Sequence, residues 1–157
     1  MIIATVDPAG SRVEARTDHA QVISMDADPP EGDDSAAGPK EALLAALAGC
    51  TSMDVASILR KKRQVADTYE IQVTGDSADA HPKIFTTITV EHRVSGAVEA
   101  EALRRSIELS ATRYCPVSAM LSAVATIEHR YRLSGADGTS RMALVTITGP
   151  AGARPGA

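Results

Sequence analysis

The sequence predicts an α+β fold, and three observations support that prediction. Segments 69–75, 84–94, 125–133 and 141–148 alternate apolar with polar residues, which is the period of half-buried β-strands. Segment 39–59 is almost continuously apolar or small, as a helix covered on nearly all sides is. Strands and helices come in separate groups rather than in a regular β-α-β alternation, which favours α+β over α/β.

The first part of the chain is predicted to form a three-stranded meander. Its short strands are expected at 1–6, 13–17 and 21–25. A polar loop rich in helix breakers follows at 26–38. The long helix then begins with Gly38 and Pro39, because proline is suited to the first helical turn. It ends in the basic run 60–63, whose cations complement the negative end of a helix and are not read as a nucleic-acid site.

The elements after the long helix are predicted to form a second sheet with two further helices. The strands at 69–75 and 84–94 are expected to pair as neighbours. A second helix is predicted from about 99 to 112, and a third begins at Pro116. The last two strands enclose a turn-forming loop at 134–139.

Length and composition limit the classes of function. The chain has 157 residues, and we expect one compact domain over 1–148 followed by a frayed Gly/Pro/Ala-rich tail at 149–157. Aromatic residues make up only 3% of the chain and tryptophan is absent, so platforms for stacking nucleobases are missing. The formal net charge is −4, and the sequence pI is near 5.5. These values predict small-molecule or protein partners rather than nucleic acid.

The sequence also bears on where the protein works. Residues 1–8 lack the basic region and long apolar core of a secretory signal, and no apolar run is expected to approach the ~20 residues of a membrane span. We therefore expect a cytoplasmic protein that does not bind membranes.

Cys50 and Cys115 are the two cysteines of the chain, and their neighbours point to chemistry. Cys50 lies well inside the predicted long helix. Cys115 is expected at or beside an N-cap because Pro116 suits the first position of a helix. Free backbone N–H groups there favour a thiolate and can lower the pKa of the thiol below its usual ~8.5. In a reducing compartment, a pair of thiols is more often catalytic or redox-sensing than structural.

The histidines do not predict a metal site. His19, His81, His92 and His129 are scattered along the chain without the spacing of metal ligands. His92 and His129 are expected on the exposed faces of their strands. The acidic loop at 26–34 lacks the ligand spacing and the glycine of a calcium loop.

Three blocks of the chain form a recognisable pattern around the two cysteines. The blocks are Gly38-Pro39-x-Glu41-x-Leu43-Leu44-Ala45-Ala46-Leu47-x-Gly49-Cys50-Thr51-x-Met53-Asp54-Val55-x-Ser57-Ile58-Leu59, His81-Pro82-Lys83-x-Phe85-Thr86, and Glu108-Leu109-Ser110-Ala111-x-x-Tyr114-Cys115-x-Val117-Ser118-x-Met120-Leu121. They resemble the OsmC/Ohr family of thiol-dependent peroxidases, in its general OsmC-like branch. The resemblance covers roughly residues 20–133, and two cysteine blocks in this order are a specific signal.

The resemblance implies a fold, an activity and roles for both cysteines. It implies an intertwined α+β homodimer with an N-terminal strand meander, a long central helix, a second sheet with two further helices, and active sites at the subunit interface. It implies reduction of organic hydroperoxides in oxidative-stress defence, with Cys50 as the peroxidatic thiol and Cys115 as the resolving thiol. A Cys50 sulfenate would be followed by a Cys50–Cys115 disulfide, which a lipoyl-type dithiol reduces, without cofactor or metal.

The chain departs from the family pattern around the first cysteine. In the well-studied branch, a glutamate ten positions before that cysteine orients an arginine that stabilises the thiolate. Lys40 occupies that position here, and Glu41 follows it, turned by about 100° on a helix. This rotation is enough to turn the carboxylate of Glu41 off the reacting face, so Glu41 replaces the family glutamate poorly. The arginine is expected from the N-terminal strands, where Arg12 and Arg16 are both available and neither is assigned.

The sequence leaves other interpretations open. The chain can form a non-catalytic dimer that binds a small apolar ligand or senses oxidation. It can also be another thiol-transfer enzyme, because a reactive cysteine does not define its electrophile. Free cysteine is, moreover, among the most buried residue types, so an inert pair of core thiols is the plain alternative. The sequence does not identify the physiological substrate or reductant.

Overall fold

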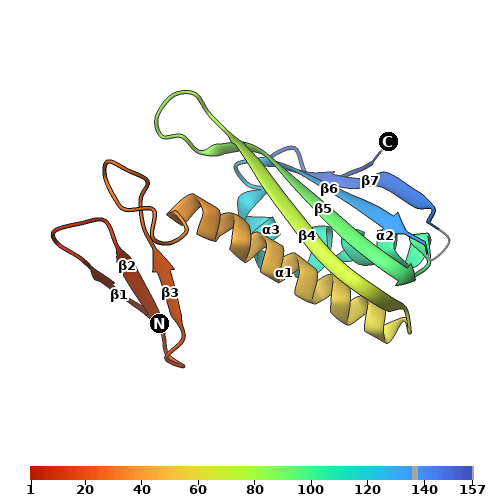
Figure 1. The fold of residues 1–157 in the computed structure, drawn as a ribbon. Helices are drawn as coiled ribbons and strands as arrows, with labels where there is room; N and C mark the ends of the chain where they lie inside the picture. Colours follow the sequence, from red (N-terminus) through yellow and green to blue (C-terminus); the bar gives the residue numbers. More distant parts are fainter. Residues whose placement is uncertain (136–137, 157) are drawn as a thin grey trace. The chain divides into compact units, whose positions relative to one another are not determined.

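The computed structural model describes residues 1–135 and 138–156 and divides into two compact units, Met1–Ala45 and Ala46–Ala157 (Figure 1). The elements in chain order are β1 Ile2–Val6, β2 Val13–Thr17, β3 Val22–Met25, α1 Pro39–Lys61, β4 Val65–Ser77, β5 Phe85–Ala97, α2 Ala100–Leu109, the π-helical turn η1 Ser110–Tyr114, α3 Pro116–Leu121, β6 Thr126–Ser134, β7 Ser140–Thr148 and β8 Arg154–Pro155. This order confirms the predicted α+β class. A single domain over 1–148 stays a prediction.

The first unit contains the predicted meander. Strands β1, β2 and β3 form an antiparallel three-stranded sheet in that order. The loop after β3 is organised by the buried carboxylate of Asp26, which accepts hydrogen bonds from the hydroxyls of Ser11 and Ser35 and from the backbone N–H of Ala27. These hydrogen bonds, that of Ser11 first, hold the pKa of Asp26 well below its usual range. A polar loop is ordered here by one carboxylate.

The second unit is built on a five-stranded sheet in the order β4-β5-β6-β7-β8. Strands β4 and β5 pair antiparallel, which confirms the predicted neighbours. Strands β5 and β6 pair in parallel, and β7 returns antiparallel to β6. Parallel neighbours need a long crossover connection, and α2, η1 and α3 provide it. The crossover brings Cys115 to the helical layer of this unit.

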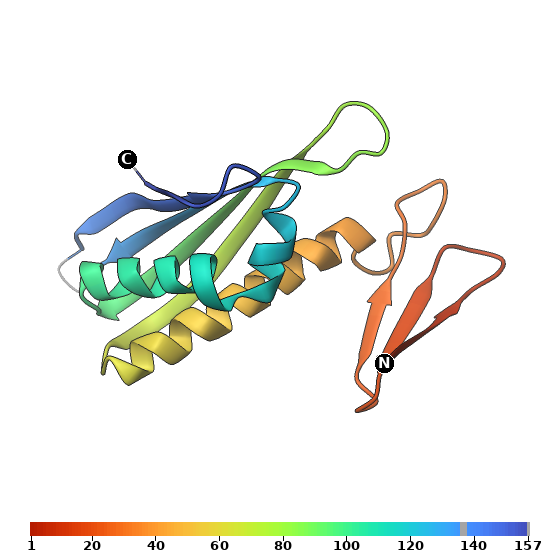
Figure 2. The same ribbon diagram turned by 180° about the vertical axis from the view of Figure 1, so that it is seen from behind.

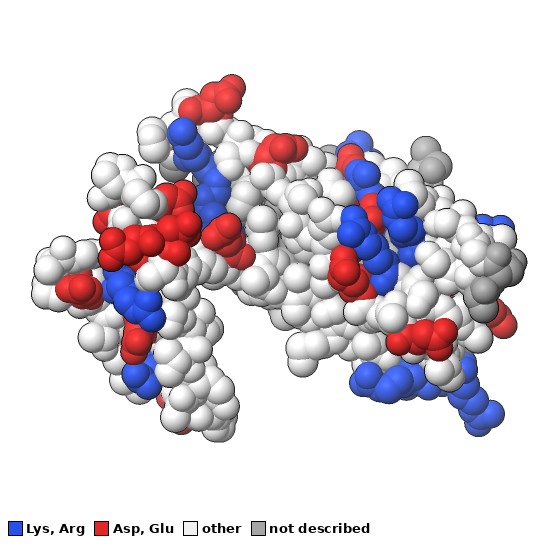
Figure 3. Space-filling model, viewed as in Figure 1, with Lys and Arg blue, Asp and Glu red and all other residues white. Residues whose placement is uncertain are grey.

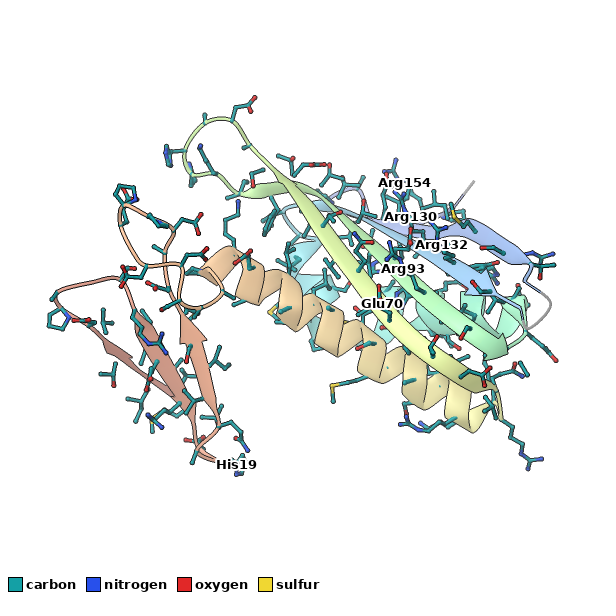
Figure 4. The ribbon with its side chains drawn as sticks, viewed as in Figure 1. His19, Glu70, Arg93, Arg130, Arg132 and Arg154 are labelled. Atoms are coloured by element: carbon teal, nitrogen blue, oxygen red, sulfur yellow. The ribbon has the colours of Figure 1, made fainter. Side chains whose placement is uncertain are left out.

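The helices of the second unit lie on one face of the sheet (Figures 1 and 2). Its core joins residues from α1, α2 and the sheet: Val55, Leu59, Val94, Val98, Leu103, Ile107, Tyr131 and Val145. The opposite face carries interspersed charges (Figure 3), and Figure 4 labels Glu70, Arg93, Arg130 and Arg132 there. Arg93 and Arg132 both pair with Glu91. A solvated charged face and a helix-covered apolar face explain the alternation in the sequence.

Several predicted boundaries differ in the structure, and β4 Val65–Ser77 and β5 Phe85–Ala97 are longer than the predicted strands 69–75 and 84–94. The second helix ends as an α-helix at Leu109 rather than near 112, because the chain passes into the wider turn η1. Within the expected frayed tail, β8 pairs with β7, and the backbone N–H of Gly156 donates to the carbonyl of Val145 at 2.9 Å. Residues 136 and 137 of the predicted loop and residue 157 of the tail lie outside the described residues.

Helix α1 is more apolar than the sequence analysis allowed. By length and composition it could cross a bilayer, a property that the core helices of soluble proteins share. The expectation that no apolar run approaches a membrane span is therefore wrong. Only 22% of its most apolar window is buried in the structure, so much of this surface is uncovered in a single chain.

Candidate active site

Helix α1 places Cys50 beside the part of the helix that packs against the sheet. Leu47, Thr51 and Val55 follow one another at four-residue spacing and are fully buried. Cys50 lies next to this buried stripe and is half-buried, and Asp54 lies one helical turn further along with similar exposure. The thiol and the carboxylate therefore share one face of the helix.

The turn η1 places Cys115 at the start of α3. The backbone N–H of Cys115 donates to the carbonyl of Ser110 at 2.9 Å, which closes the π-helical turn. Such turns inside helices are frequent at functional sites. Cys115 then adopts an extended conformation as the N-cap of α3, with Pro116 at the first helical position. The position expected for Cys115 beside Pro116 is thus observed, although the π turn before it was not foreseen.

The two sulfurs lie 2.7 Å apart although the cysteines are 65 residues apart in the chain. Both are free thiols. A disulfide bond is about 2.05 Å long, so the sulfurs need to approach by only about 0.7 Å to be bonded. The arrangement fits a pair of thiols that can be oxidised to a disulfide without rebuilding the backbone.

Hydrogen-bond donors surround the sulfur of Cys115. Its Sγ accepts from the backbone N–H of Ser118 at 3.3 Å and from Oγ1 of Thr51 at 3.6 Å. The residue is only 2% exposed. Cys115 is therefore held in one position and shielded from solvent, which suits a thiol that meets a partner sulfur inside the protein.

Cys50 has the opposite electrostatic setting. Burial raises the pKa of its thiol to about 11, and the hydrogen bond with Cys115 and the negative charge of Asp54 contribute further. The backbone N–H of Val117 lowers the pKa and offsets only part of these effects. The Cys50 thiol is therefore protonated at pH 7. A positive charge near this sulfur would favour its thiolate.

Asp54 is held by the same residue that positions Cys115. The hydroxyl of Ser110, which is fully buried, donates to Oδ2 of Asp54 at 3.0 Å. The carbonyl of Ser110 accepts from the N–H of Cys115. Sequence reasoning did not single out Asp54 or Ser110. The four-residue spacing from Cys50 to Asp54 was the available signal.

The other candidate residues lie in the Met1–Ala45 unit. Oε2 of Glu41 accepts from the backbone N–H of Gly38 at 2.8 Å, which caps the first turn of α1. Arg12 donates to the hydroxyl of Ser35 at 2.7 Å, and Arg16 pairs with Glu14 at 2.9 Å. Glu41 therefore has a capping contact, and the arginine that would support the thiolate is still unassigned.

Cys50, Asp54 and Cys115 also bring three possible metal-ligand atoms within 4.8 Å of one another among the described residues. Two thiolates bound to one Zn²⁺ at about 2.3 Å in tetrahedral geometry lie about 3.7 Å apart. The observed separation of 2.7 Å is much shorter. The geometry therefore fits a thiol pair better than a zinc site.

The prediction that His92 and His129 lie on exposed strand faces is wrong, since both are fully buried. His92 shares its strand face with Val90 and Val94, and this face packs under the helices. Burial lowers the pKa of His92 to about 3, with a smaller effect from His129. Burial lowers the pKa of His129 to about 4. Both rings are therefore neutral at physiological pH.

Few hydrogen bonds compensate the burial of these rings. Nδ1 of His92 lies 2.6 Å from the hydroxyl of Tyr69. Nε2 of His92 and both ring nitrogens of His129 have no hydrogen-bond partner among the described residues. They belong to the core of the second unit rather than to the cysteine site.

The sequence and the fold agree on a family. Residues 32–130 match the family model described as OsmC-like protein. This chain belongs to the OsmC-like family. The protein YhfA of Escherichia coli K12 is 36% identical over 104 residues, which cover 66% of this chain and 78% of YhfA.

Solved structures of OsmC-like proteins have the same fold. An OsmC-like protein from Mycoplasma pneumoniae superimposes with a TM-score of 0.73 at 22% identity and covers 85% of this chain and 95% of its own. An organic hydroperoxide resistance protein from Elizabethkingia anophelis superimposes with a TM-score of 0.65 at 14% identity and covers 86% of this chain and 96% of its own. At these identities the likeness establishes the fold alone. The chemistry of this OsmC-like member must be argued from its own residues.

Proposed function

We propose that this protein reduces organic hydroperoxides by a two-thiol cycle, as part of oxidative-stress defence. The observation that carries the proposal is the 2.7 Å separation of the Cys50 and Cys115 sulfurs. Membership of a family that includes organic hydroperoxide resistance proteins supports it. The cycle needs a reducing compartment, so we also propose a cytoplasmic location.

The cycle has three steps. The thiolate of Cys50 attacks the distal peroxide oxygen, the O–O bond breaks, and the alkoxide leaves as an alcohol after taking a proton. The thiol of Cys115 condenses with the resulting Cys50 sulfenic acid, which forms the disulfide and releases water. An external dithiol then reduces the disulfide by two thiol–disulfide exchanges. Cys50 is the better first nucleophile because it is half-buried, whereas Cys115 is 2% exposed.

The raised pKa of Cys50 sets a condition on this proposal. A cation must approach the sulfur before the thiolate is populated. We propose that an arginine supplies the charge within a homodimer; Arg12, Arg16 and other arginines of the chain are candidates, and none is assigned. Helix α1 favours such a dimer because most of its apolar window is uncovered.

Exposed apolar side chains within a few residues of one or the other cysteine in the chain also support a dimer and an apolar substrate. Met53 on α1 is 74% exposed, Tyr114 before Cys115 is 50% exposed, and Met120 on α3 is 65% exposed. Clustered exposed apolar residues mark interfaces or ligand sites. Each methylene of a substrate tail that becomes buried contributes about 0.8 kcal/mol, so alkyl hydroperoxides should be preferred over hydrogen peroxide.

Two measurements test the proposal. Wild type treated with one equivalent of cumene hydroperoxide should form a Cys50–Cys115 disulfide by intact mass. Cys115→Ser should carry one oxygen on Cys50 and progress to sulfinic acid when a second equivalent is added, and Cys50→Ser should stay unmodified. Repeated peroxide consumption with dihydrolipoamide should follow in wild type alone. If both thiols survive excess peroxide at pH 7, the proposed function is wrong.

The assembly is tested separately. Light scattering at micromolar concentration should give the mass of a dimer. A folded, monodisperse monomer would contradict the proposed assembly.

One observation favours a second candidate function. The raised pKa of Cys50 counts against rapid turnover, while the 2.7 Å between the two sulfurs still allows a single oxidation to a disulfide, as in a sensor. Formation of the disulfide without repeated peroxide consumption would favour this sensor.

A further inference from the structure

Asp54 stands beside both cysteines without a role in the cycle described above. One of its carboxylate oxygens lies within 4.8 Å of both sulfurs. It is half-buried, so water can reach it. Its negative charge opposes ionisation of Cys50, which makes it a hindrance to the first step. This carboxylate is therefore better placed for a function in the later step, disulfide formation.

The position of Asp54 is fixed from the side of Cys115. The Ser110 hydroxyl donates to Oδ2 of Asp54 at 3.0 Å, and the Ser110 carbonyl accepts from the Cys115 N–H at 2.9 Å. One buried residue thus sets both the carboxylate and the second thiol. The ionisable groups that face Asp54 in the described residues are Cys50 on its own helix and Cys115 at the start of α3.

We infer that Asp54 is the proton carrier of the disulfide-forming step. The carboxylate removes the proton from the Cys115 thiol, directly or through one water, and returns it to the oxygen that leaves Cys50. This inference rests on the proposed two-thiol cycle and assigns a residue to its second step. General acid–base transfer by a placed side chain accelerates such steps by about 10²–10⁴-fold.

The step balances in atoms and electrons. The Cys115 proton moves to Asp54, and the Cys115 sulfur attacks the sulfur of the Cys50 sulfenic acid. The S–S bond forms while the S–O bond breaks. Hydroxide leaves and takes the proton from Asp54 to become water. Cys115 is oxidised, Cys50 is reduced, and Asp54 returns to its ionised form.

A matched pair of variants separates this role from a structural one. Asp54→Asn keeps an oxygen that can accept from Ser110 but cannot carry a proton at neutral pH. Ser110→Ala keeps the carboxylate and removes the hydroxyl that holds it. A proton carrier predicts that the first variant is impaired more in disulfide formation, whereas a structural tether predicts the reverse.

The experiment is a single turnover with one equivalent of cumene hydroperoxide. Samples quenched with dimedone report sulfenic acid, and intact mass reports the disulfide. Asp54→Asn should form sulfenic acid at least as fast as wild type but convert it to disulfide about 10²-fold more slowly. Ser110→Ala should be slowed only a few-fold. In Asp54→Asn the rate of conversion should also depend on the concentration of an added buffer base, because a base from solution must then take the proton of the Cys115 thiol.

The outcomes distinguish the two proposals. Normal sulfenic acid formation with disulfide formation within threefold of wild type in Asp54→Asn would overturn the role of Asp54 and leave the cycle intact. Absence of any oxidised product in wild type would overturn the proposed function and this inference with it. Should Asp54→Asn fail to fold, wild-type disulfide formation must be slower in deuterium oxide, and equal rates would overturn the inference.

Discussion

The cysteine site and the pair of buried histidines are two polar features of the same unit, and they differ in their partners. The sulfur of Cys115 accepts from Thr51 and Ser118, and Asp54 accepts from Ser110. Both ring nitrogens of His129, in contrast, have no hydrogen-bond partner among the described residues. The cysteines keep contact with solvent through Cys50, whereas both histidines are fully buried.

This difference distinguishes a site that can react from polar side chains that are merely buried in the core. A reactive group needs access and neighbours that change its protonation. The buried histidines stay neutral because burial lowers their pKa values, and the unpaired ring nitrogens of His129 cost stability rather than serve a reaction. Both Cys50 and the two histidines have strongly shifted pKa values, so the shift alone does not distinguish a reactive site from a buried core. The hydrogen bonds around each group do.

The largest expected effect is on activity at the cysteines. Cys50→Ser should lower peroxide turnover by more than about 10³-fold, because the nucleophile is lost. Its free energy of unfolding should change by less than about 1 kcal/mol, since the substitution is small and half-buried. Turnover with dihydrolipoamide and urea unfolding measure the two quantities. If this variant kept more than a tenth of wild-type peroxide turnover, the assignment of Cys50 as the nucleophile would be wrong.

The second effect is on stability at the histidines. His129→Ala should lower the free energy of unfolding by about 2–4 kcal/mol, because it opens a cavity in the core. His129→Leu should cost less, since an apolar side chain of similar size needs no hydrogen bond. His19→Ala is the control: His19 is exposed and should shift stability by less than about 0.5 kcal/mol. Equal losses for His129→Ala and His19→Ala would show that the ring is not part of the core.

The third effect is a loss of stability in mild acid. The folded pKa values of about 3 and about 4 lie below the unfolded value of about 6.5, so only the unfolded chain binds protons at these sites near pH 5. Each histidine then removes about 1.4 kcal/mol per pH unit as the pH falls from 6.5 toward 4, and no penalty remains above pH 7. Urea unfolding between pH 5 and 8 should show this slope, and His129→Leu should halve it. If the free energy of unfolding of His129→Leu had the same pH slope as that of wild type, His129 would not be one of the groups that cause it.

The smallest effect concerns the charge of Asp54. In a Cys115→Ser background, Asp54→Asn should lower the pKa of Cys50, by less than burial raises it, because a neighbouring negative charge is removed. The rate of alkylation by iodoacetamide against pH measures this value. Ser110→Ala in the same background is the control, because it keeps the charge. A pKa that stays the same after Asp54→Asn would mean that burial alone sets it.

The sequence determined the local structure around both thiols. Apolar residues at three- and four-residue spacing placed Cys50 inside α1, and Pro116 placed Cys115 at the N-cap of α3. Helix periodicity and proline geometry act over a few residues, so they can be read without the fold. The alternation within β5 also places His92 on the same face as Ile88, Val90 and Val94. The prediction that this histidine is exposed disagreed with that pattern.

Only the tertiary structure decided which residues meet. It set the 2.7 Å between two sulfurs that are 65 residues apart, and it brought Asp54 and Ser110 together across 56 residues. It also paired β5 with β6 in parallel and buried the face that carries both histidines. Sequence periodicity fixes which side chains share a face, but not which face is covered, because covering depends on elements that are distant in the chain.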